Sequence, residues 1–137
     1  MTSDRVRRTI LAIASVTVLC AAFELAAERH WGTAVKLIPW YAVAALVFCI
    51  GTLAVRPTKI GIRIVRVVLV GVAITSIVGI YEHVHENFIA GPLDYRYTDR
   101  WPAMSLWSQW WAAFVKTVGP APTLAPGVLL LAAVLVH

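Results

Sequence analysis

The feature that most constrains this chain is a set of apolar runs, each about as long as a bilayer is thick. They lie at residues 9–28, 35–55, 60–84 and 117–136. About 20 residues of helix cross the ~30 Å hydrocarbon core of a membrane. We therefore predict an all-α integral membrane bundle of four transmembrane helices, forming a single domain over residues 1–137.

Composition supports a membrane protein. Hydrophobic residues make up 60% of the chain and charged residues 14%, whereas a soluble domain has about 25% charged residues. Too few polar side chains remain to cover a water-facing surface. The net charge of +5 would suggest nucleic acid in a soluble protein. Here the basic residues flank apolar runs, so we expect the lipid bilayer as partner and no nucleic acid.

Two of the four runs are less regular than the others. The run at 9–28 follows three arginines and also has the layout of a signal peptide, but we interpret it as an uncleaved first helix. The fourth run contains helix breakers, which membrane helices tolerate when neighbouring helices satisfy the freed backbone groups. These breakers are Pro120, Pro122, Pro126 and Gly127.

Charge predicts the orientation. Seven basic residues precede the first run or lie around the second connection: Arg5, Arg7, Arg8, Arg56, Lys59, Arg63 and Arg66. By the positive-inside rule both termini are cytoplasmic, in a multi-pass inner-membrane protein. All six tryptophans map to the outer side. The long outer connection between the third and fourth helices is predicted to contain an interfacial helix at about 101–116.

The aromatic and basic stretch at 95–101 suggests either a lipid-headgroup or partner contact, or an interfacial anchor. We favour the anchor, because Trp and Tyr prefer this depth whatever a protein does.

Ionisable residues within the apolar runs are the candidates for chemistry, because a bilayer makes them costly. Glu24 and Glu28 lie four residues apart on the first helix, at the outer end of a stripe of small residues, Ala21, Cys20 and Thr17. On the third helix the small residues Gly71, Thr75 and Gly79 lead outward to Glu82, His83 and Glu86, while His85 points largely away. If the two stripes pack together, the acids and His83 converge in one outward-facing cluster.

Such a cluster suits a transition metal such as Zn, Cu or Fe. The candidate metal ligands are Glu24, Glu28, Glu82, His83, His85 and Glu86. Glu82-x-x-His85 has the Glu-x-x-His spacing of di-metal carboxylate bundles, although those sites need two such motifs. Two alternatives remain open: a scaffold of ion pairs with Arg29, Arg96, Arg100 or Lys116, and a proton-linked step.

The chain resembles small uncharacterised four-helix bacterial inner-membrane proteins. The likeness is carried by Ile38-Pro39-Trp40, by Gly79-Ile80-Tyr81-Glu82-His83, by Leu124-Ala125-Pro126-Gly127 and by the acid-ended first helix. No activity is established for that group, so the resemblance implies a fold and no mechanism.

The sequence favours a structural or accessory subunit of a membrane complex, in contact with other membrane subunits or with copies of itself. A metal- or ligand-binding protein and a small proton-linked transporter are the alternatives. We expect no enzyme, because the chain has no nucleophile–base pair and no phosphate- or dinucleotide-binding motif.

Overall fold

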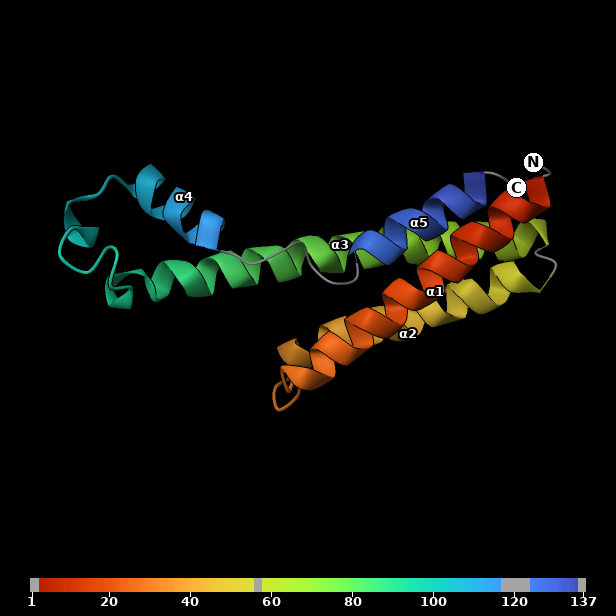
Figure 1. The fold of residues 1–137 in the computed structure, drawn as a ribbon, viewed down its shortest axis with the longest axis horizontal. Coiled ribbons are helices and arrows are strands. Elements are labelled where there is room, and N and C mark those ends of the chain that lie inside the picture. Colours follow the sequence, from red (N-terminus) through yellow and green to blue (C-terminus); the bar gives the residue numbers. More distant parts are fainter. Residues whose placement is uncertain (1–2, 56–57, 117–123, 136–137) are drawn as a thin grey trace. The chain divides into compact units, whose positions relative to one another are not determined.

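The computed structural model describes residues 3–55, 58–116 and 124–135, and this part of the chain is all-helical (Figure 1). It has five α-helices and two short 3-10 helices. In chain order they are α1 (Ser3–Ala27), α2 (Ala34–Ala54), α3 (Lys59–Ile89), η1 (Gly91–Leu93), η2 (Trp101–Ala103), α4 (Leu106–Lys116) and α5 (Leu124–Leu135).

Within the described residues, α1, α2 and α3 are long and apolar enough to cross a membrane. The prediction of an all-helical chain is thereby confirmed, and three of the four predicted spans correspond to helices that could cross a membrane. The fourth predicted span, 117–136, corresponds in part to α5, and its residues 117–123 and 136 lie outside the described part of the chain. The predicted interfacial segment at 101–116 contains η2 and α4.

The chain divides into two compact units, and α3 contributes to both. The bundle unit comprises Met1–Ser76 and Ala121–His137, and the hairpin unit comprises Ile77–Pro120. The bundle unit therefore contains α1, α2, α5 and the first part of α3. The hairpin unit contains the last part of α3, both 3-10 helices and α4.

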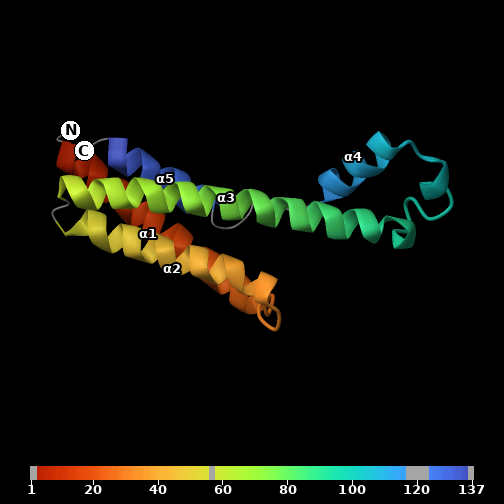
Figure 2. The same ribbon diagram turned by 180° about the vertical axis from the view of Figure 1, so that it is seen from behind.

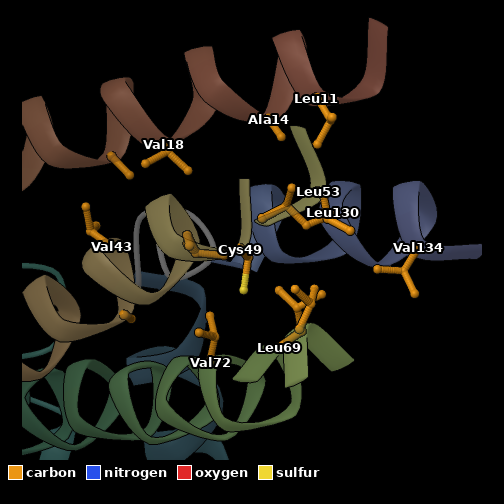
Figure 3. Packing of buried hydrophobic residues seen from close by; sticks show 14 of the residues in the cluster. Leu11, Ala14, Val18, Val43, Cys49, Leu53, Leu69, Val72, Leu130 and Val134 are labelled. Carbon is orange, nitrogen blue, oxygen red and sulfur yellow. The ribbon is translucent and has the colours of Figure 1, made fainter. Parts of the chain in front are cut away.

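The core of the bundle unit is a seam of small and branched apolar side chains. On α1 the buried residues are Leu11, Ala14, Val18, Ala21 and Leu25. Their spacing alternates between three and four, which is the pattern of left-handed helix packing. On α3, buried Val65, Leu69, Val72 and Ser76 repeat it. Figure 3 shows side chains from α1, α2, α3 and α5 meeting, with Cys49 and Leu53 of α2 among them.

Five hydroxyl groups in the bundle unit donate to carbonyls of their own helices. The Ser15 Oγ donates to the carbonyl of Leu11 (2.8 Å) and the Ser76 Oγ to the carbonyl of Val72 (2.9 Å). Thr17, Thr52 and Thr75 do the same with carbonyls three or four residues before them. Such bonds lower the cost of placing a hydroxyl among apolar neighbours.

One end of the bundle unit gathers four helix ends. The start of α1, the end of α2, the start of α3 and the end of α5 lie together there in both views (Figures 1 and 2). This end carries Arg5, Arg7 and Arg8 on α1 and Lys59 and Arg63 on α3. Five of the seven basic residues that predict the orientation therefore share one end of the bundle.

Candidate functional site

The hairpin unit is held together by aromatic side chains. The end of α3 turns back through η1 and η2, so that α4 lies beside it (Figures 1 and 2). The Phe88 ring stacks on the Trp110 ring with centroids 4.5 Å apart, and the Asn87 Nδ2 donates to the carbonyl of Ala113 (3.3 Å). These contacts join the two helices directly.

Trp101 is the centre of this packing. Its side chain is buried at 6% exposure, and the Phe88 ring meets it edge-on at 5.8 Å. Gly91 is also buried, and a Cβ at that position would overlap three atoms of the six-membered ring of Trp101. The Gln109 Nε2 donates to the Trp101 carbonyl (2.7 Å), which ties α4 to η2. Glycine is required at position 91 by this close approach.

Asp94 is the buried charge of the hairpin unit, with its side chain only 5% exposed. Arg96 grips both carboxylate oxygens, with Nε 3.1 Å from Oδ1 and Nη2 2.9 Å from Oδ2. The Arg96 backbone N–H donates to Oδ1 (3.0 Å), and Lys116 Nζ of α4 lies 3.2 Å from Oδ2. We call Asp94, Arg96 and Lys116 the charge triad.

The Arg96 hydrogen bonds, with a smaller contribution from Lys116, hold the pKa of Asp94 well below its usual range. The triad thus fixes the loop to the end of α4 with a charge-assisted, two-pronged contact. Arg96 and Lys116 were predicted as partners for the glutamates of the cluster, but in the structure they pair with Asp94.

The sequence interpretation overlooked Asp94. A signal for it exists, because an Asp followed two residues later by a basic residue in a turn-forming stretch can bond the backbone N–H at that position as an Asx turn.

The basic and aromatic stretch closes on itself. The guanidinium groups of Arg96 and Arg100 lie 5.5 and 5.2 Å from the centroid of the Tyr97 ring. That ring in turn meets Trp101 edge-on at 5.9 Å. Cation–π contacts of this kind stabilise the loop itself.

Glu24 and Glu28 of the predicted cluster belong to the bundle unit. Glu24 is exposed near the end of α1. Glu28 is exposed just beyond that helix, with its Oε2 3.9 Å from the Nδ1 of His30. The connection between α1 and α2 is held to α2 by a hydrogen bond from the Trp40 Nε1 to the His30 backbone carbonyl (2.8 Å).

The other four predicted ligands lie on α3 in the hairpin unit. Glu82 is half-buried, and His83 and Glu86 are exposed. His85 is half-buried, with its ring 5.9 Å from that of Tyr81 and 6.4 Å from that of Trp110. Over residues 3–55, 58–116 and 124–135, no three His, Cys, Asp or Glu side chains gather in a group that could hold a metal ion.

The predicted cluster requires Glu24 and Glu28 of the bundle unit to meet ligands of the hairpin unit. That convergence stays a prediction. The small stripes expected to bring them together form the seam of the bundle only in part. Ala21 of the α1 stripe is buried in the seam, but Cys20 is exposed, and a Cβ on Gly71 would meet nothing within 4 Å. Helix α1 packs instead against α2 and α5, through the line from Leu11 to Leu25.

Comparison of the chain with protein-family models, with curated proteins and with solved structures gives no match.

Proposed function

We propose that this chain is a structural or accessory subunit of a membrane complex. The observation that carries the proposal is the charge triad with its aromatic packing. In the hairpin unit, Asp94 is enclosed by two cations of the same unit, and Tyr97 and Trp101 are covered by neighbours. The polar groups of the hairpin unit therefore stabilise one fixed conformation, as a surface that docks on another subunit requires.

The hydroxyl groups of the bundle unit favour the same proposal over transport. Three of the four polar candidates for a path across the membrane, Thr17, Thr52 and Thr75, each donate their hydrogen to a carbonyl of their own helix. Intramembrane pathways rely instead on ionisable or polar groups that face a shared cavity.

In the proposed topology the chain crosses the inner membrane four times with both termini in the cytoplasm. The basic end of the bundle unit supports this orientation by the positive-inside rule. Helix α3 has 31 residues, a length of about 46 Å, which exceeds the ~30 Å hydrocarbon core. With Lys59 inside, the last turns of α3 lie outside the core, and we propose that α4 lies in the outer interface.

Helix α4 has the side chains for that position. Its exposed face carries Trp107, Trp111 and Phe114, and its inner face carries buried Ala112 and Ala113. Aromatic rings on one face of a short helix favour the headgroup region of a bilayer.

We expect the protein extracted with its native lipids to be part of an assembly larger than one 15.0 kDa chain. The measurement is the protein mass of polymer-extracted nanodiscs by light scattering. Asp94→Asn should lower the assembled fraction, because it releases the loop from Arg96 and Lys116. Asp99→Asn is the matched control, being exposed and in the same loop. A single-chain mass for the unaltered protein would overturn the proposal.

Elemental analysis distinguishes the hypothesis of a metal site from the hypothesis of a structural scaffold. We expect no stoichiometric metal in the protein purified in mild detergent, nor in the Glu24→Ala, His83→Ala double variant. A metal present at one or two equivalents and lost in the double variant would instead establish a binding site at the predicted cluster.

A further inference from the structure

A groove on the bundle unit lies between α3 and α5. Its apolar walls come from Leu69, Val70, Val72 and Ala73 of α3 and from Val128 and Leu131 of α5. Gly127 forms part of the floor, since a Cβ there would come within 3.8 Å of the Val72 side chain. The groove is open on one side and has a volume of about 120 Å³, and an apolar cavity of ~150 Å³ in another protein is known to admit benzene. A stretch of one acyl chain fits such a space.

Arg66 gives the groove a charged mouth. It lines the groove at the end nearer the start of α3, and it is exposed. The ion pairs found within the described residues join other side chains and leave Arg66 out. The guanidinium therefore lies beside an apolar groove, and none of the ion pairs of residues 3–55, 58–116 and 124–135 gives it a carboxylate partner. Ser76, at the far end, has its hydroxyl bonded to the Val72 carbonyl.

The depth of Arg66 suits a lipid headgroup. It lies seven residues after Lys59, the first residue of α3, which is about 10 Å along the helix. A long basic side chain at that depth extends toward the interface and keeps its methylenes among apolar groups. The groove continues from Arg66 deeper along α3, in the direction that an acyl chain takes from its headgroup.

From the charged mouth, the apolar walls and their order along α3, we infer that this groove binds an anionic phospholipid. Its phosphate contacts Arg66, and one acyl chain lies between α3 and α5. The inference does not depend on the accessory role proposed above, because a lipid site would be present in an isolated chain as well.

The test is native mass spectrometry of the full chain, delipidated in detergent and titrated with phosphatidylglycerol or with phosphatidylcholine carrying the same acyl chains. We expect a preference for phosphatidylglycerol. Arg66→Gln should weaken its binding about fivefold, which is the effect of one basic residue on an anionic lipid. Arg8→Gln, an exposed arginine at the same end of the bundle, should change it by less than twofold.

Filling the groove tests the acyl-chain half of the inference. Ala73 and Val128 are both exposed on opposite walls, so Ala73→Phe and Val128→Phe fill the slot from either side. Both should weaken the binding of both lipids, and helicity and melting by circular dichroism identify a variant that fails to fold. Equal binding of the two lipids to the unaltered protein would overturn the inference. Lipid binding that is unchanged in both folded variants would also overturn it. If the variants change the mass of the assembly and leave lipid binding unchanged, the groove would instead be a contact site for a neighbouring protein helix.

Discussion

Replacing Gly91 with alanine should open the hairpin unit. The added Cβ would occupy the space of the Trp101 ring, which is itself held by Phe88 and by the Gln109 bond to its carbonyl. Overpacking of a well-filled site costs about 1–3 kcal/mol. An opening equilibrium shifted by that amount raises the rate of cleavage within the loop roughly 5- to 150-fold, when cleavage samples the open state. The measurement is the rate of trypsin cleavage after Arg96 and Arg100 in the purified protein.

Gly79→Ala is the matched control for this experiment. Gly79 lies on α3 in the same unit, and a Cβ there would meet nothing within 4 Å. Its cleavage rate should equal that of the unaltered protein. If Gly91→Ala cleaved no faster than Gly79→Ala, the close packing of Gly91 on Trp101 would not be what closes the hairpin.

Asp94→Asn should lower the melting temperature of the hairpin unit at neutral pH and remove its sensitivity to acid. The pKa of Asp94 in the folded hairpin lies below its unfolded value, chiefly because of Arg96. Its stabilisation is therefore fully present above the unfolded pKa of ~3.9. It declines as the pH falls below that value and is lost once the pH passes through the folded pKa.

The measurement for Asp94 is thermal melting followed by near-ultraviolet circular dichroism, which reports the packing of Trp101 and Trp110. The difference in melting temperature between the two proteins should be constant from pH 7 to about pH 4 and should shrink in more acidic solution. Asp99→Asn should track the unaltered protein throughout. If Asp94→Asn and the unaltered protein melted at the same temperature at pH 7, or if their difference persisted in acid, the charge triad would not be what fixes the loop to α4.

The long apolar helices could be predicted because the length of an apolar run can be compared directly with the thickness of a bilayer. The runs at 9–28 and 35–55 correspond to α1 and α2 within a few residues, apart from an earlier start of α1. The third run was predicted to end at 84, but α3 continues to Ile89. Its last turns are polar, and they are helical because Phe88 and Asn87 pack on α4. The apolar pattern of the sequence does not predict this packing on α4.

The packing faces were harder to predict than the helices. The small residues Thr17, Cys20 and Ala21 on α1 suggested the packing face, but only Ala21 among them is buried, as part of the line from Leu11 to Leu25. In a membrane helix almost every side chain is apolar, so hydrophobicity does not distinguish the lipid-facing side from the protein-facing side. The three-and-four spacing of Leu, Val and Ala is the signal that identifies it.

The charge triad needed long-range information as well. The Arg96 contact is local, two residues from Asp94, and could have been proposed as a turn. The Lys116 contact joins residues 22 positions apart, and it exists only because α4 folds back on α3.

The hydroxyl groups of the bundle unit have a consequence for how the protein should be handled. Ser15, Thr17, Thr52 and Thr75 each donate their single hydrogen to a carbonyl of their own helix. The buried contacts between the helices are made mainly by Leu, Val and Ala side chains. Lipid tails are as apolar as those side chains, so dispersion forces at short range decide the association. The lateral pressure and chain length of the surrounding amphiphile should accordingly govern whether the bundle survives extraction.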